Sequence, residues 1–316
     1  MSSSCDFDAA APYVPPDQEW TPSKLCDAID FWNPSIVSQI RSMGQQPRFH
    51  TKQWEYAQLL ECAARFAPSV ETMVGLGCGV EPTIVRLAAN AQQIITTDLY
   101  GMPGAWKNAA KRPDELWPDL KNLRVHSMNM RQIDLPPESA DFVWSLCAVE
   151  HVGNADAVVD AVRQAGKLLR PGGHFFLSTE FTFGDATFYA PASPSGTLFL
   201  DRSTLKRFFT ETGLHLVAPL DLRLSTHPMN VPVWDQLNNH GAYNIPHVIY
   251  RCQPMPFWGT YGGCVSMVLC KEDKGADYFV EDPDQRARLE PMWRLGRKLS
   301  RQLTLPSRWW MTLGRW

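Results

Sequence analysis

The sequence predicts an α/β fold in which a doubly wound, mainly parallel sheet of seven strands is preceded by helices and followed by a tail. Short apolar runs alternate with helical stretches through the middle of the chain, which is typical of βαβ units. A glycine-rich turn follows the first of these runs. Of the 316 residues, 44% are hydrophobic and 20% are charged, as expected of a globular protein rather than a disordered or fibrous one.

The segment before the core, residues 1–66, is predicted to be an arm followed by helices. The first 22 or so residues are rich in Ser, Ala, Pro and Asp and have no periodicity, so we expect a loosely held arm. Apolar positions then recur at helix-like spacing between residues 24 and 66. This spacing predicts two or three helices.

The core is predicted to span residues 67–272. Its strands are predicted at residues 72–76, 93–98, 123–128, 142–147, 174–179, 215–219 and 264–270. Helices are predicted between them at residues 83–90, 155–169 and 202–212.

Two long segments interrupt this rhythm, residues 184–200 and 221–259, and both are rich in Pro, aromatic residues and His. Long loops at the ligand-bearing edge of such a sheet commonly shape a substrate site. We therefore expect the insertion 221–259 to form an acceptor pocket, and we assign no catalytic role to its polar and aromatic residues: His227, Asn230, Trp234, His240, His247, Arg251 and Trp258.

The last part of the chain, residues 273–316, is predicted to be a linker and a basic amphipathic tail. From residue 285 onward there are eight basic residues and one acidic residue, so this stretch carries +7 and the rest of the chain carries −10. A negative body disfavours a nucleic-acid substrate. A basic helix with tryptophans can touch an anionic membrane surface, whereas the alternative is docking on its own domain or on a second copy.

The cysteines and the apolar runs limit the other classes of function. The eight cysteines are scattered, with no CxxC pair and no Cys/His zinc spacing, so we expect buried, reduced thiols and no metal site. No secretory signal and no apolar run of about 20 residues is present. These features predict a cytoplasmic protein whose membrane contact, if any, is peripheral.

The turn at residues 75–82 is the first sign of a ligand. Its glycines permit a tight turn and a close approach of the backbone to a ligand. Asp98 ends the next apolar strand, nineteen residues after Gly79, where a carboxylate accepts hydrogen bonds from ribose hydroxyls. The two features together predict an adenosine-type ligand, although Asp98 as a turn cap is the alternative.

NAD is disfavoured as that ligand. The dinucleotide fingerprint requires a third glycine, and Pro82 occupies its position. Asn129 follows the next predicted strand and could accept a hydrogen bond from the adenine amino group. This pattern favours a mononucleoside pocket.

Six segments taken in order resemble a class I S-adenosylmethionine-dependent methyltransferase with a Rossmann-like fold. They are residues 74–81, 97–99, 129–130, 141–145, 150–153 and 169–173, and the resemblance extends over roughly residues 48–270. The stretches FHTKQWEY at 49–56 and GCGVEP at 77–82 also resemble a bacterial subgroup of these enzymes that modifies small molecules or glycans.

The resemblance implies S-adenosylmethionine as the cofactor and assigns residues to its parts. The methionine portion lies over the glycine turn, the ribose is held at the end of the following strand, and the adenine is read after the next strand. The residues so implied are Gly75, Gly77, Cys78 and Gly79 at the turn, Asp98 and Leu99 at the ribose, and Asn129 and Met130 at the adenine.

The sequence departs from the family pattern at two positions. Gly75 stands where an acidic residue is usual, and Glu81 stands where a third glycine is common. Our hypothesis is that Glu81, or a residue of the segment 52–56 that contains Trp54, supplies the missing polar contact to the cofactor.

The pair Glu150 and His151 follows the strand predicted at 142–147, whose carboxyl end should face the reacting methyl group. Methyl transfer from a sulfonium depends chiefly on positioning, but a hydroxyl acceptor also needs a base. His151 is the candidate base, and Glu150 would orient it or bind the acceptor. The alternatives are a capping or packing role for His151 and a local salt bridge for Glu150.

The sequence therefore predicts an S-adenosylmethionine-dependent methyltransferase that acts on an oxygen of a small molecule or saccharide. The alternative is a catalytically silent relative that binds the cofactor as a sensor or partner subunit.

Overall fold

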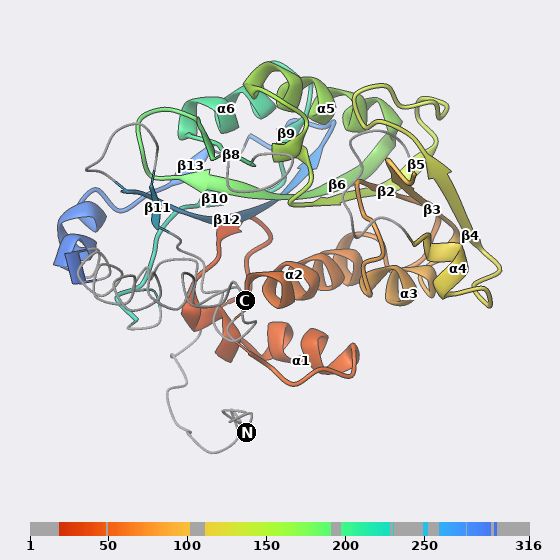
Figure 1. Ribbon diagram of the computed structural model, residues 1–316, viewed down its shortest axis with the longest axis horizontal. Coiled ribbons are helices and arrows are strands. Elements are labelled where there is room, and N and C mark those ends of the chain that lie inside the picture. The colour runs from red at the N-terminus through yellow and green to blue at the C-terminus, as the bar shows by residue number, and fades with distance from the viewer. Residues whose placement is uncertain are drawn as a thin grey trace, which may run out of the picture.

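The computed structural model describes residues 19–48, 50–101, 111–190, 197–227, 230, 249–251, 259–275, 277–291 and 294–295. These residues form three layers, with helices on both faces of a central sheet (Figure 1). The Rossmann-like α/β fold predicted from the sequence is confirmed. The predicted division of the chain at residues 66 and 272 stays a prediction.

The N-terminal segment folds as a short strand and three helical elements. These are β1 (Lys24–Leu25), the 3-10 helix η2 (Ala28–Trp32), α1 (Pro34–Ser42) and α2 (Thr51–Phe66). Side chains cap both α-helices, because Asn33 accepts the Ser35 N–H at 3.0 Å and the His50 Nδ1 accepts the Lys52 N–H at 3.1 Å. The prediction of two or three helices before the core is confirmed.

Five parallel strands form the cofactor-binding half of the sheet, in the spatial order β6-β5-β2-β3-β4. Each contains most of a strand predicted from an apolar run. They are β2 (Val70–Leu76), β3 (Ala91–Asp98), β4 (Leu123–Ser127), β5 (Ala140–Leu146) and β6 (Leu169–Thr182). The helical elements between them are α3 (Thr83–Ala88), α4 (Pro113–Leu116), η4 (Val149–His151) and α5 (Ala155–Leu168).

The other half of the sheet is built around β12 (Gly259–Cys270), which runs antiparallel to β6 from Cys270↔His174 to Gly262↔Thr182. Short strands lengthen this half, so the sheet has eleven strands in the described part of the chain rather than the predicted seven. The strand predicted at residues 215–219 is shortened to β9 (His215–Leu216). The strands that were not predicted are β1, β10 (Leu220–Asp221), β11 (Ile249–Arg251) and β13 (Phe279–Val280), which are too short to show a period-2 pattern.

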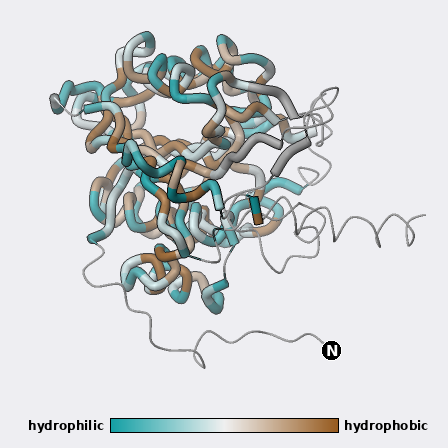
Figure 2. Tube along the Cα trace, turned by 90° about the vertical axis from the view of Figure 1, so that its left-hand side faces the viewer, coloured by the Kyte–Doolittle hydropathy of each residue, from teal (hydrophilic) through white to brown (hydrophobic). Residues whose placement is uncertain are grey.

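Residues 184–200, predicted as a loop, contain a hairpin of β7 (Phe188–Ala190) and β8 (Thr197–Phe199), and α6 (Arg202–Thr210) follows. Helices α5 and α6 cover one face of the sheet, and α1, α2 and α3 lie on the other (Figure 1). Hydrophobic segments concentrate between these layers, as the brown parts of the trace show (Figure 2). Burial of these apolar faces is the main stabilising force of the fold.

The first part of the basic tail docks on its own domain. The Gln285 side chain donates to the Leu222 carbonyl and accepts from the Leu224 N–H, and Leu289 is fully buried. Residues 296–316, with the predicted tryptophans, lie outside the described residues, as do the arm 1–18 and Trp234, His240, His247 and Trp258. Among the helices that the structure does describe, none combines the length and hydropathy required to cross a bilayer.

Candidate functional site

The glycine turn lies between the carboxyl end of β2 and the start of α3. Gly77 and Gly79 have positive φ angles of 64° and 48°, which side chains rarely tolerate. A Cβ added to Gly77 would lie 2.5 Å from the Met130 Cε and 2.7 Å from the Ala148 Cβ. The predicted adenine residue Met130 thus packs directly against the predicted methionine turn.

Asp98 closes this turn from the end of β3. One carboxylate oxygen accepts the Gly79 N–H at 2.9 Å, and the other accepts the Leu99 N–H at 2.6 Å. The Tyr100 hydroxyl donates to the Gly79 carbonyl at 2.6 Å. Partial burial raises the pKa of Asp98 above its ordinary value. The structure therefore brings the predicted ribose residue to within hydrogen-bonding distance of the glycine turn.

Gly75 is a glycine because the Trp144 ring occupies the space beside it. A Cβ added to Gly75 would lie 2.3 Å from the Trp144 Cζ2. No acidic side chain fits there, which explains the departure from the family pattern. The Trp144 indole N–H in turn donates to the Glu81 Oε2 at 3.3 Å.

Trp144 therefore links Glu81 to the end of β2, near Gly75, where the family pattern has an acidic residue. Burial raises the pKa of Glu81 to about 8, despite the favourable charge of Lys52. A carboxylate with this pKa is poised to ionise when a cation arrives.

The remaining cofactor candidates take different places. Cys78 is fully buried, its N–H donates to the Thr97 carbonyl at 3.1 Å and its carbonyl accepts the Glu81 N–H at 3.2 Å, so it shapes the turn rather than offering its N–H to a ligand. Asn129 is exposed, and its side-chain oxygen already accepts the Arg131 N–H at 2.9 Å. It borders a polar hollow of about 350 Å³ that is shared with α5. The second lone pair of that oxygen and the amide nitrogen are left for a ligand, so the predicted bond from the adenine amino group stays a prediction.

Helix α2 presents a polar face to the same edge of the sheet. Lys52, Glu55 and Tyr56 share that face at i, i+3 and i+4 spacing. The Lys52 Nζ donates to the Glu55 Oε2 at 2.9 Å and to the Leu146 carbonyl at 3.3 Å. Burial, with the nearby charge of Glu81, raises the pKa of Tyr56 well above its ordinary value.

Trp54 lies on the opposite side of α2 from this face. Its ring is fully buried in a cluster with the N-terminal segment, and its indole N–H donates to the Asp30 Oδ2 at 2.8 Å. The structure thus separates Trp54 from the other predicted cofactor residues and uses it to hold α2 against the N-terminal segment.

Glu150 and His151 lie in η4, directly after β5. The Glu150 side chain is buried, and its Oε2 accepts the Thr179 hydroxyl at 3.2 Å. Burial raises the pKa of Glu150 to about 7. This contact replaces the local salt bridge that was the alternative for Glu150. His151 is half-buried beside it.

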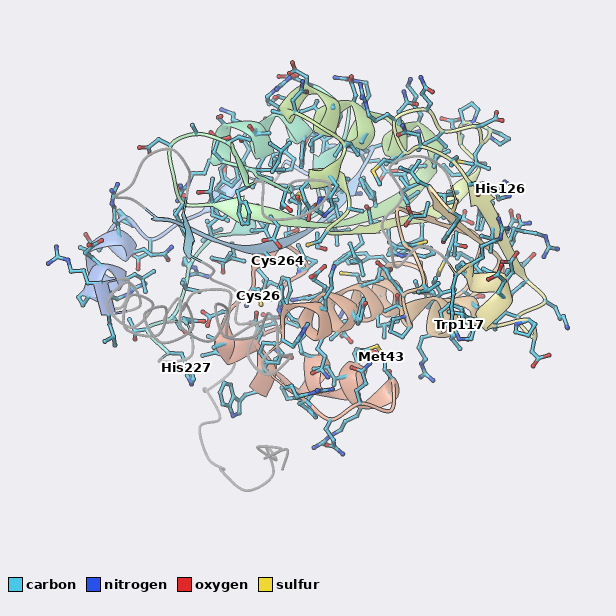
Figure 3. The ribbon with its side chains drawn as sticks, in the orientation of Figure 1. Cys26, Met43, Trp117, His126, His227 and Cys264 are labelled. Atoms are coloured by element: carbon cyan, nitrogen blue, oxygen red, sulfur yellow. The ribbon has the colours of Figure 1, made fainter. Side chains whose placement is uncertain are left out.

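Cys147, Ser178 and Cys264 complete this region, and none of them was predicted from the sequence. The two sulfur atoms are 3.6 Å apart, and Ser178 donates to the Glu55 Oε2 at 2.9 Å. Figure 3 shows Cys264 between the sheet and the N-terminal helices. Because Cys147 and Cys264 are 117 positions apart, no local spacing reveals the pair. By contrast, the i, i+3, i+4 spacing within 52–56 could have revealed Glu55 and Tyr56.

The region has features that fit an adenosine cofactor with an amino-acid end. A Cβ added to Gly79 would approach only the Asp98 Oδ2, at 3.7 Å, so the turn is open there. The Thr83 hydroxyl at the start of α3 is buried and has no partner within the described residues. Glu81 offers a carboxylate to a cation. These groups match the hydroxyls, carboxylate and ammonium of S-adenosylmethionine in chemical type.

Comparison with known protein families identifies this part of the chain. The model of a family described as "Methyltransferase domain" matches residues 74–177, which extend from β2 through most of β6 and include the glycine turn, Asp98 and Glu150. The chain thus contains a methyltransferase domain, and the enzyme class predicted from the sequence is confirmed. No curated protein matches the sequence.

Solved structures with a similar fold include the YcgJ protein of Bacillus subtilis, at 14% identity and a TM-score of 0.46, covering 69% of this chain and 98% of that one. An S-adenosylmethionine-dependent methyltransferase of Clostridium acetobutylicum, at 9% identity and a TM-score of 0.42, covers 70% of this chain and 91% of that one. A geranyl diphosphate methyltransferase solved with GPP and sinefungin has 14% identity and a TM-score of 0.47, and the match covers 69% of this chain and 77% of that one. Likeness at this level concerns the fold and not the substrate.

Proposed function

We propose that this protein uses S-adenosylmethionine to methylate a hydroxyl oxygen of a small molecule or saccharide. The observation that carries the proposal is the meeting, at one edge of the sheet, of the glycine turn closed by Asp98 and a buried carboxylate, Glu150. In open α/β sheets, ligands bind outside the carboxyl ends of the strands, where both features lie.

Asp98 and Glu81 would hold opposite ends of the cofactor. Asp98 accepts two backbone N–H groups and retains further lone pairs for the ribose hydroxyls. Glu81, held by Trp144, would accept the ammonium of the methionine portion. S-adenosylmethionine, when bound, supplies the methyl group as a sulfonium.

Glu150 and His151 would act on the acceptor. The Thr179 hydroxyl fixes the orientation of the Glu150 carboxylate, so its other oxygen can accept a proton or a hydrogen bond from the acceptor. His151, the next residue, is half-buried and is the second candidate for the base. A buried carboxylate kept beside the cofactor edge favours an active enzyme over a silent binding protein.

The acceptor class rests on the resemblance of residues 49–56 and 77–82 to the subgroup that modifies small molecules or glycans. Lys52 and Tyr56 of the first stretch and Glu81 of the second lie close enough to affect one another's pKa, whereas Trp54 of the first stretch packs on the N-terminal segment. The proximity of these three residues, from two motifs 20 or more positions apart, supports the assignment to the subgroup.

The first test is calorimetric titration of the protein with S-adenosylmethionine and S-adenosylhomocysteine. We expect binding of both ligands, lost in Asp98→Ala and weakened in Asp98→Asn, which keeps an acceptor for the Gly79 N–H. Methyl transfer to a panel of phenols, polyols and saccharides then tests the acceptor class. No binding of either ligand, or transfer confined to amines and carbon acids, would contradict the proposal.

A further inference from the structure

Cys147, Cys264 and Glu55 come from three separate elements and converge on one point. Cys147 follows β5, Cys264 lies on β12 and Glu55 lies on α2. One ligand atom from each residue lies within 4.8 Å of the others. Thiolates and carboxylates are ligands of zinc, and their convergence is the first sign of a metal site.

The distance between the two sulfur atoms fits a shared metal ion. In a tetrahedral site with sulfur at about 2.3 Å from zinc, two sulfur ligands lie about 3.8 Å apart. The observed separation is 3.6 Å. The ion would therefore need little movement of either side chain.

Cys147 and Cys264 approach each other from opposite sides of β6, because Leu146 pairs with Ser178 and Glu180 pairs with Cys264. The two sulfur atoms are farther apart than the roughly 2.05 Å of a disulfide, and an ion can bridge them without that approach.

Glu180 belongs to a separate convergent set with Cys147 and Glu150. Three protein ligands, Cys147, Cys264 and Glu55, therefore meet at the first point. Zinc sites with three protein ligands take a water molecule at the fourth position.

The remaining contacts leave room for the ion. Both hydrogen bonds that Glu55 receives, from Lys52 and from Ser178, go to its Oε2, so Oε1 is left for coordination. Cys147 has a φ of +46°, an uncommon conformation for a residue with a side chain. Such strain is often kept where a side chain must be aimed at a ligand.

We propose that Cys147, Cys264 and Glu55 bind one zinc ion between α2 and the sheet, with a water molecule as its fourth ligand. The site goes beyond the proposed methyl transfer and does not depend on the identity of the acceptor. It lies beside Glu150 and Lys52, so the ion would also rigidify the wall of the acceptor site.

Cobalt(II) titration of the reduced, chelator-treated protein tests the site, because Co²⁺ takes zinc positions and reports thiolate ligands by a charge-transfer absorption band. We expect one equivalent of Co²⁺ to give this band with the visible absorption of a tetrahedral centre, and Zn²⁺ to displace it. Cys147→Ser and Cys264→Ser should each weaken binding on the order of 100-fold or more. Cys62→Ser, at a buried thiol elsewhere in α2, should leave it unchanged.

Two further results decide the case if the serine variants fold poorly. X-ray absorption of the zinc-loaded, unaltered protein should show two sulfur and two oxygen neighbours. Absence of a thiolate band at equimolar Co²⁺, loss of binding in Cys62→Ser alone, or ready formation of a Cys147–Cys264 disulfide in air would overturn the proposal. Because all these readouts are independent of methyl transfer, they can fail while the proposed function stands.

Discussion

Two groups of buried charged residues differ in how many hydrogen bonds their carboxylates accept. In the N-terminal group, Asp30 accepts from the Lys24 ammonium, the Asp27 N–H and the Trp54 indole N–H. Asp27 accepts from the Ile29 N–H, from both the backbone and the hydroxyl of Ser225, and from the Asn230 amide. Each of these two carboxylates therefore accepts at least three hydrogen bonds within the described structure.

In the second group, at the cofactor edge, Glu81 and Glu150 each accept one side-chain hydrogen bond within the described structure. Glu55, Glu81 and Glu150 lie around Lys52, which bonds to only one of them, Glu55. Burial raises the pKa of Glu81 to about 8 and that of Glu150 to about 7. A dense hydrogen-bond network is typical of a structural role, whereas buried carboxylates with few donors and raised pKa values are typical of a functional site. Loss of a carboxylate should therefore reduce stability in the first group and function in the second.

The largest effect is expected from Glu150→Gln. Removing the proton-accepting carboxylate should lower kcat by about 10² to 10⁴-fold, while Gln keeps the size and the bond to Thr179. Steady-state methyl transfer to an accepted hydroxyl substrate measures the change. Glu61→Gln, on the face of α2 that contacts α1, is the matched control and should keep full activity. Full activity in Glu150→Gln would assign the base to His151 or to another group.

Asp30→Ala should show the opposite behaviour. It leaves the Lys24 ammonium and the Trp54 N–H buried without their acceptor, so we expect a loss of about 3–5 kcal/mol in the free energy of unfolding. Urea unfolding measures this loss, and cofactor titration of the folded fraction should give an unchanged Kd. A Kd that weakens in parallel with stability would remove the distinction between the two groups.

Gly75→Ala tests the contact that places Glu81. Its Cβ would overlap the Trp144 ring, and overpacking of this kind costs about 1–3 kcal/mol. Trp144→Leu should recover part of the stability in the double variant but should weaken cofactor binding, because the bond to Glu81 is lost. Chemical denaturation of the two single variants and the double variant gives the coupling. Purely additive changes would mean that the ring relaxes away from position 75.

The sequence was sufficient to predict those elements whose pattern is local. Strands β2 to β6 and helices α5 and α6 were predicted because each is long enough to show its own period. The glycine turn and Asp98 were predicted because a strand, a turn and the end of the next strand lie within about 25 residues of sequence.

The rest depends on contacts that only the folded sheet creates. Cys264 meets Cys147 across β6, and the two-residue strand β1 reaches β12 from the other end of the chain. The motif at 49–56 was recognised as one unit, but its residues divide between two sides of α2. Trp54 was therefore grouped with the cofactor residues although its ring packs on the N-terminal segment.

The smallest effects concern the protonation of Glu81. With a pKa of about 8, this group is mostly protonated at pH 6 and must ionise to bind an ammonium. The apparent affinity for S-adenosylmethionine should therefore rise about tenfold between pH 6 and pH 7, below the pH at which the cofactor's amino group loses most of its proton. Calorimetry in buffers of different ionisation enthalpy should show proton release on binding. Glu81→Gln should bind more weakly and with a flat pH profile.

The same group should lower stability as the pH rises. The pKa of Glu81 is higher in the folded state than its unfolded value of 4.5, so unfolding releases a proton between about pH 4.5 and pH 8 and stability falls over that interval. Glu81→Gln removes this dependence and should raise Tm by a few degrees at pH 8.5 but little at pH 5. Thermal unfolding of both proteins at the two pH values measures the difference. An equal shift at both values would mean that the glutamine acts through packing and not through the uncompensated charge of the site.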